Sequence, residues 1–212
     1  MANQQMNQPS MNPQMPGGNI TFNHGGHEVL DLHEVLSGLM GQMEQYMLYQ
    51  EHIQDQELMN ICQNQSQFMN SQYNIMVEAF STGNDPSMPT SSYKMNQSND
   101  VTYGLTPSQP SKPKQSVNEL DDKCISSFMI GLAKANATAL TTASLESTNP
   151  VVRRVLADSI PNFIEMAYEL FLYQNKNGYY QVPQLAQQDM QQILNSFAKS
   201  PMIEQTGQNN LQ

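Results

Sequence analysis

Histidine and carboxylate residues near the amino end come closest to the spacing of a metal site. His27, Asp31 and Glu34 recur at i, i+4 and i+7, so a helix would place them on one face. Imidazole and carboxylate groups bind zinc and copper. Ligands at a fraying helix start bind weakly, however, and acids there also complement the positive helix end. We therefore interpret this group as an acidic first turn and predict no metal site.

A dinuclear metal centre inside a helical bundle would need inward glutamates and two Glu-x-x-His pairs. The sequence has other residue types at the third position after its later glutamates: Ser81 after Glu78, Tyr168 after Glu165, and Leu172 after Glu169. Glu44, Glu57 and Glu165 could form a carboxylate cluster, but exposed helix glutamates are the commoner case. The sequence thus predicts no cofactor and disfavours a di-iron oxidase.

Candidate nucleophiles are equally isolated. Beyond His52 there is no histidine, so Cys124 and the later serines lack an evident base. Cys62 and Cys124 are too few for a disulfide framework or a zinc ribbon, and we interpret each as a small core residue. A later oxidative cross-link between cysteines stays open as an alternative. We predict no catalytic residue and no enzymatic activity.

Methionine and tyrosine are the remaining residue types with a pattern. The methionines recur at helical spacing, which is typical of an adaptable core. Four tyrosines crowd the end of one predicted helix: Tyr168, Tyr173, Tyr179 and Tyr180. We interpret them as amphipathic residues at the core edge. The alternatives are oxidative cross-linking or a patch for a partner. We interpret the Gln-rich tail as a solvated linker, with an assembly or cross-linking segment as its alternative.

Composition narrows the classes of partner. The chain has 212 residues and a formal charge of −10, with 13% charged residues and no Trp. This charge argues against a nucleic-acid or acidic-membrane partner, because both require clustered Lys and Arg. No stretch reaches the ~20 apolar residues of a membrane helix, and no secretion-signal layout is present, so we expect no membrane insertion and synthesis in a cytosol.

The stretch from Leu145 to Asn175 must position much of the core. Asn149 can cap a helix that begins at Pro150, and Asn177-Gly178 can end it. Its apolar residues follow the three/four spacing of one buried stripe: Val152, Val155, Leu156, Phe163, Met166, Leu170 and Tyr173. Pro161 interrupts this pattern and should bend the helix. A preceding helix would make a tight corner at the Ser-Thr-Asn-Pro segment.

Three further long helices are predicted upstream, and a short one follows. The first carries a stripe of Val29, Leu32, Leu36, Leu39, Met43, Tyr46 and Met47. The second begins after Asp55 and carries Leu58, Ile61, Cys62, Phe68, Met69, Tyr73, Met76 and Phe80. A capping box from Ser116 to Glu119 should open the third. Its small face should let a neighbouring helix approach closely and form the tightest helix contact: Gly131, Ala135, Ala139 and Ala143. The fifth spans Leu185 to about Ser200.

Loop lengths suggest the topology. Short corners pair the first helix with the second and the third with the fourth, and residues 83–115 form a long Pro-rich crossover. The predicted fold is an all-α, ferritin-like four-helix bundle with a short fifth helix, over residues 23–200. Residues 1–22 and 201–212 are predicted to be disordered tails, since they hold too little apolar surface to order themselves.

Three stretches resemble a known family. HGGHEVLDLHEVL, DPSMPTSSYKMNQSNDVTYGL and LESTNPVVRRVLADSIPNFIEMAYELFLYQNKNGYYQVPQL are similar to the coat F-type spore coat proteins of endospore-forming bacteria. The resemblance covers roughly residues 24 to 200, and its third block includes the unusual Pro161 and the corner at Asn149. It implies a ferritin-like helical protein of the spore coat without an established reaction, and it supplies no site residues.

Two functions from different classes follow as expectations. The first is a structural component of the endospore coat, made in the mother-cell cytoplasm, which assembles with other coat proteins and can self-associate. The alternative is a ferritin-like metal-binding or redox protein of sporulating cells. The missing Glu-x-x-His pairs favour the first.

Overall fold

The computed structural model describes residues 24–200, so the tails predicted over residues 1–22 and 201–212 lie outside the described part of the chain. Within it the fold is all-helical, as predicted. The helices are α1 (Gly26–Gln50), α2 (Gln56–Thr82), the 3-10 helix η1 (Val117–Glu119), α3 (Asp122–Glu146), α4 (Pro150–Lys176) and α5 (Gln187–Leu194). None of the helices in residues 24–200 has both the length and the apolar character of a bilayer span.

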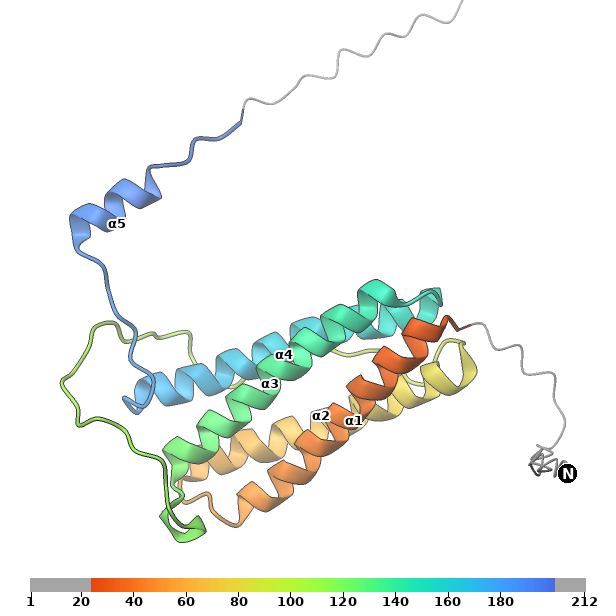
Figure 1. The fold of residues 1–212 in the computed structure, drawn as a ribbon, viewed down its shortest axis with the longest axis horizontal. Helices are drawn as coiled ribbons and strands as arrows, with labels where there is room; N and C mark the ends of the chain where they lie inside the picture. Colours follow the sequence, from red (N-terminus) through yellow and green to blue (C-terminus); the bar gives the residue numbers. More distant parts are fainter. Residues whose placement is uncertain (1–23, 201–212) are drawn as a thin grey trace, which may run out of the picture.

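Four long helices form a bundle around one apolar core. α1 and α4 run in one direction, and α2 and α3 run in the other (Figure 1). α3 and α4 share the most extensive contact, while α1 packs on α2 and α3, and α2 packs on α4. Each helix therefore touches two neighbours, which is the arrangement that buries one stripe per helix.

The helix α4 confirms the pattern read from its sequence. Asn149 caps it, with Oδ1 accepting from Val151 N at 2.9 Å and Val152 N at 3.1 Å. All seven residues of the predicted stripe are buried. The helix continues through Pro161, which is exposed, although proline has no N–H to donate to the carbonyl one turn earlier. Gly178, with φ of 70°, turns the chain away after the helix ends.

The helix α2 also follows its predicted bounds. Asp55 caps it by accepting from Glu57 N at 2.8 Å, and Gly83 ends it in the left-handed conformation with φ of 65°. The predicted stripe is buried or half-buried throughout. The polar residues Gln65 and Gln72, which the stripe did not include, are buried with it.

The predicted stripe of α1 was partly wrong. Val29 and Met47 are exposed, Met47 by 63%, whereas Val35 and Gln42 are buried. The buried column runs through Leu32, Val35, Leu39, Gln42 and Tyr46. Residues at the margin of the apolar face of α1 remain in water, because the contact with α2 and α3 is narrower than the stripe read from the sequence.

The predicted start of α3 was also wrong. Ser116 caps only η1, by accepting from Asn118 N at 3.2 Å. The helix α3 begins at Asp122, and Asp121 caps it by accepting from Cys124 N at 2.9 Å. That backbone hydrogen bond is the main cause that lowers the pKa of Asp121 to about 2. Two potential caps lie within six residues, and the second one begins the longer helix.

The small face predicted on α3 does not form the helix contact. Gly131 and Ala135 are exposed and Ala139 is half-buried, so of the predicted group only Ala143 is buried. The buried column instead runs through Met129, Ala133, Asn136, Leu140 and Ala143. The prediction followed the small residues alone, but burial follows the three/four spacing that continues into the large apolar residues.

The fifth helix is shorter than predicted and does not join the core. It spans Gln187–Leu194 instead of residues 185–200, and none of its residues is buried. It stands apart from the bundle, beyond the end of α4 (Figure 1). The chain reaches it after Val182, which pairs with Tyr103 and Gly104 in isolated bridges.

The segment between α2 and η1 is bound to α4 over much of its length. Side chains spaced along α4 accept from its backbone: Asn162 Oδ1 from Tyr93 N at 2.9 Å, Glu169 Oε1 from Asn96 N at 3.5 Å, and Asn175 Oδ1 from Thr102 N at 2.7 Å. Residues 107–118 are exposed throughout. We call the first part of this segment, residues 83–106, the strap on α4. The second part, residues 107–118, lies in solvent.

Candidate functional site

The residues considered as metal ligands from the sequence are not brought together. His27 and Glu34 are exposed at the start of α1, with Asp31 half-buried between them. Glu44 is exposed on α1, while Glu57 lies 2.7 Å from Lys176 Nζ. Within residues 24–200 no group of three His, Cys, Asp or Glu side chains is arranged to hold a metal ion.

A different set of polar residues crosses the middle of the bundle. We call it the transverse network: Asn136 from α3, Gln42 and Tyr46 from α1, Gln65 from α2, Glu169 from α4, and Tyr93 from the strap. All six side chains are buried. The network therefore links all four helices and the strap through the apolar core.

Hydrogen bonds run continuously through the transverse network. Asn136 Nδ2 donates to Gln42 Oε1 at 2.6 Å, and Gln42 Nε2 donates to Tyr46 Oη at 3.2 Å. Tyr46 Oη in turn donates to Gln65 Oε1 at 2.9 Å. Gln65 Nε2 donates to Glu169 Oε2 at 2.9 Å and to the Met166 carbonyl at 3.1 Å.

Glu169 is the one carboxylate of the transverse network. Tyr93 Oη donates to its Oε2 at 2.5 Å from the strap. Burial raises the pKa of Glu169, and repulsion from Glu165 adds to this, while the hydrogen bonds from Tyr93 and Gln65 oppose it. Burial likewise raises the pKa of the Tyr46 and Tyr93 hydroxyls, so both remain protonated donors.

The sequence contained a signal for this network. Gln42, Gln65 and Asn136 occupy places in the buried three/four columns where an apolar residue would otherwise stand. A stripe read only from apolar residues skips such positions. At Gly38, an added Cβ would lie 3.0 Å from Asn136 Oδ1, so this glycine leaves room for the end of the network.

A cleft opens beside Glu169 between α2, α4 and the strap. Its volume is about 620 Å³, and Asn60, Asn64, Asn96 and Gln97 contribute amides to its walls. The Glu57–Lys176 ion pair lies at one side of it. Amide groups donate and accept hydrogen bonds but bind hard metal ions less well than carboxylates do. The cleft thus combines the buried Glu169 carboxylate with amide walls, the Glu57–Lys176 ion pair and the Asp100 carboxylate.

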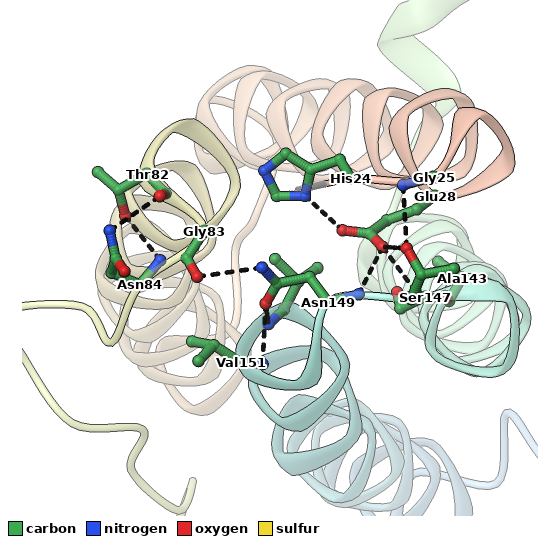
Figure 2. Close-up of polar contacts among 12 residues, drawn as sticks. His24, Gly25, Glu28, Thr82, Gly83, Asn84, Ala143, Ser147, Asn149 and Val151 are labelled. Atoms are coloured by element: carbon green, nitrogen blue, oxygen red, sulfur yellow. Dashed lines mark hydrogen bonds and ion pairs between the residues drawn. The ribbon is translucent and has the colours of Figure 1, made fainter. Parts of the chain in front are cut away.

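A second polar cluster ties the bundle together at the corner between α3 and α4 (Figure 2). The buried Glu28 carboxylate accepts from the backbone N–H of Thr148 at 2.6 Å and of Asn149 at 2.9 Å. His24 Nδ1 lies 2.6 Å from its other oxygen. Asn149 Nδ2 also donates to the Gly83 carbonyl at 3.1 Å. We call this the corner cluster, and it joins the start of α1, the end of α2 and the α3–α4 corner.

The hydrogen-bond donors of the corner cluster stabilise the negative charge of Glu28. Burial alone would raise the pKa of Glu28, but the hydrogen bonds from Asn149, His24 and Thr148 together lower it below its ordinary value. Glu28 is therefore an ionised anchor, whereas Glu169 is a carboxyl whose protonated form is favoured by its surroundings.

The two cysteines and the tyrosines near the end of α4 differ in burial. Cys62 is fully buried and burial raises its thiol pKa to about 12, while Cys124 is half-buried, and both thiols are free. Tyr173 is buried and its hydroxyl donates to Asp55 Oδ2 at 3.0 Å. Tyr179 and Tyr180 are exposed at the end of the bundle. The interpretation of Cys62 as a core residue is thus confirmed.

Comparison with known proteins places this architecture. The Coat F domain family matches residues 121–183, which contain α3, α4, Asn149 and Glu169. A relative in Bacillus subtilis (strain 168), "Spore coat protein F-like protein YhcQ", is 54% identical over 194 residues, which is 92% of this chain and 89% of the relative. The chain belongs to the coat F family.

A solved structure supports the fold of this coat F protein. A crystal structure assigned to a spore coat protein of Bacillus halodurans C-125 superposes with a TM-score of 0.55 at 16% identity. It covers 77% of this chain and 95% of its own. At that identity the likeness concerns the helical fold alone. Gln42, Gln65 and Tyr93 of the transverse network lie outside the matched Coat F domain. The network therefore joins that domain to the earlier part of the chain.

Proposed function

We propose that this coat F protein is a structural component of the bacterial endospore coat, which acts by assembly with other coat proteins and turns over no substrate. The observation that carries the proposal is the 54% identity to a coat F-like relative over nearly the whole chain. The match to the Coat F domain supports the same role. Synthesis in the mother-cell cytoplasm belongs to this proposal.

The interior of the bundle supports a non-catalytic role. The positions at its middle are filled by amides and phenols that bond to one another, from Asn136 through Gln65 to Glu169. A satisfied buried network specifies one packing of the helices. We infer a ferritin-like arrangement with a crossover between α2 and α3, because these two helices run in the same direction (Figure 1).

Fractionation of spores tests the proposed location. A tagged copy expressed from its own promoter is expected in the coat fraction that detergent and reducing agent extract, together with other coat proteins. A matched control is a tagged cytosolic protein of the mother cell, which should be absent from that fraction. Recovery of the tagged protein only in the spore core or in the supernatant of sporulating cells would contradict the proposal.

Metal analysis and assays separate this role from the redox alternative. Purified protein incubated with iron or manganese and then desalted is expected to retain no stoichiometric metal and to consume no peroxide. A Glu169→Gln variant provides the matched comparison, since Glu169 is the buried carboxylate among the three that line the cleft, the others being Glu57 and Asp100. Metal retained by the parent and lost in this variant, together with an activity, would establish the enzyme instead.

A further inference from the structure

The outer face of α3 and α4 carries an apolar groove. Its volume is about 440 Å³, and we call it the α3–α4 groove after its lining residues, which include Ala137, Phe163, Ile164, Ala167 and Phe171. Ile164 is 58% exposed there. At one end lies Lys134, whose ammonium is 5.8 Å from the centroid of the Tyr180 ring. The groove is therefore an apolar surface with one cation at its edge.

The helix α5 is an amphipathic helix with no residue buried against the rest of residues 24–200. Met190, Ile193 and Leu194 share one face by helical spacing, and Leu185 and Phe197 flank this face on either side. Ile193 and Leu194 are exposed, and Phe197 is 88% exposed. Burying one such side chain contributes ~1.5–3 kcal/mol, so leaving this face in water is unfavourable.

Charge matches the two surfaces to one another. Asp189 is the acidic residue in the first turn of α5, and the last turn of this helix has no basic residue. By helical spacing it lies next to Ile193, at the border of the apolar face. If α5 lies on the α3–α4 groove with its first turn toward Lys134, the Asp189 carboxylate comes near that ammonium, so this orientation is the one that charge favours.

The exit of the chain carries α5 away from its own groove. Gly104 N donates to the Val182 carbonyl at 2.8 Å, and Thr106 N donates to Gln181 Oε1 at 2.6 Å, so the chain is held at the end of the bundle. Residues 183–186 then lead outward, and α5 stands clear of α3 and α4 (Figure 1). A helix presented in this way is positioned to exchange between two copies.

We propose that α5 of one copy of this protein binds in the α3–α4 groove of a second copy, and that the second copy returns its own α5 in the same way. Because each copy both gives and receives an α5, the exchange closes on a dimer, as in a domain swap, whereas a one-way contact would extend into an open chain. This proposal rests on the assembly role proposed above and names one contact that such an assembly uses.

The mass of the purified full-length protein tests the contact directly. Sedimentation or light scattering is expected to give about twice the chain mass of 23.8 kDa. Ile193→Glu on α5 and Ile164→Glu in the groove should each halve that mass, since each places a charge in the apolar contact. Both residues are exposed within one chain, so neither substitution should disturb folding, which circular dichroism melts will verify.

Two controls make the result specific. Ala135→Glu adds the same charge at an exposed α3 position outside the groove lining, and Gln192→Glu adds it on α5 away from the apolar face. Both variants should remain dimeric. Mixing the Ile193→Glu and Ile164→Glu proteins should give a dimer that is weaker than the parent dimer, because one of its two contacts is intact: α5 of the second protein meets the groove of the first.

Each other outcome overturns the proposal. A monomeric parent whose α5 amides are protected from hydrogen exchange would mean that α5 binds its own groove, and one with unprotected α5 would leave that helix to a different protein. A dimer that survives both single variants, or no dimer on mixing them, would exclude this pair of surfaces. A monomeric parent that is still recovered in the spore coat fraction would contradict the α5 contact and leave the proposed coat role standing.

Discussion

Two buried glutamates in this protein hold opposite protonation preferences. Glu28 receives backbone and side-chain donors at the α3–α4 corner, so its pKa is lowered. Glu169 lies in the middle of the bundle, where burial raises its pKa despite the Tyr93 and Gln65 donors. Both side chains are shielded from solvent, but Glu169 lies deeper in the protein and Glu28 receives more donors, so depth of burial and hydrogen bonding together decide the difference.

The two carboxylates should therefore give stability opposite pH dependences. The lowered pKa of Glu28 contributes stability above its ordinary value, near pH 4, which is lost as pH falls through the folded pKa. The raised pKa of Glu169 contributes stability below that ordinary value, which is lost as pH rises through the folded pKa. Glu28→Gln should cost about 1–3 kcal/mol at pH 7 and less at pH 4. Glu169→Gln should reduce the loss of folding stability that the parent shows as pH rises toward neutral.

Urea unfolding of the parent and both variants between pH 4 and pH 8 measures these differences. Glu34→Gln is the matched control, because that glutamate is exposed on α1. Parallel pH profiles for Glu28→Gln and Glu169→Gln would contradict the assignment of opposite shifts.

Caps and small residues act at the scale of whole helices. Asn149 caps α4 and also donates to the Gly83 carbonyl at the end of α2, so one side chain organises two helix ends (Figure 2). Ser116 caps only the exposed η1 turn. The buried column of α3 passes through Ala133, whereas Ala135 points to solvent.

Replacing Asn149 should destabilise the protein more than replacing the cap of η1. Asn149→Ala removes the α4 cap and leaves the Gly83 carbonyl without this donor, at an expected cost of about 1–2 kcal/mol. Ser116→Ala should change the free energy of unfolding by less than about 0.5 kcal/mol. Chemical denaturation of both variants measures the gap, and equal losses would show that the corner cluster does not depend on Asn149.

The two alanines of α3 provide a matched pair for packing. Ala133→Leu should overpack the contact with neighbouring helices and cost about 1–3 kcal/mol. Ala135→Leu should be within about 0.5 kcal/mol of the parent, because the added side chain lies in water. Thermal melts distinguish the two, and the reverse order would place the buried face of α3 on the other side.

At the scale of the molecule, the segment between α2 and η1 divides into the strap, which is bound to α4, and a free part. Tyr93, Asn96 and Thr102 are hydrogen-bonded to α4 through their backbone N–H groups. Residues 107–118 have no buried residue among them. Local opening of the bound part must break several contacts with α4, while the free part is open already.

Trypsin should reveal this division. Cleavage after Lys114 is expected early, and cleavage after Lys94 only after unfolding, although both lysines are exposed. Mass spectrometry of a digestion series under native conditions orders the two cuts. An Asn162→Ala variant, which removes an acceptor of the strap, should bring the Lys94 cut forward. An early cut at Lys94 in the parent would contradict a bound strap.

The sequence was sufficient where periodicity and local caps coincide. The stripe of α4, its Asn149 cap and the bounds of α2 were predicted because each depends on residues within a few turns. The transverse network was not predicted, because Gln42, Gln65 and Asn136 meet only after three helices pack. The exposure of α5 was not predicted for a related reason, since an apolar face on a helix does not indicate which surface covers it.

The two ends of the described chain leave the bundle at opposite poles. Gly25 N donates to Thr148 Oγ1 at the α3–α4 corner, whereas Val182 follows the far end of α4, a helix of 27 residues that spans ~40 Å. A pull applied between residues 24 and 182 is therefore directed along the helix axes. Such tension loads the interhelical contacts in shear and all together, so they resist as one unit instead of peeling apart one by one. A protein anchored at both ends of the bundle would thus resist tension applied along its helices.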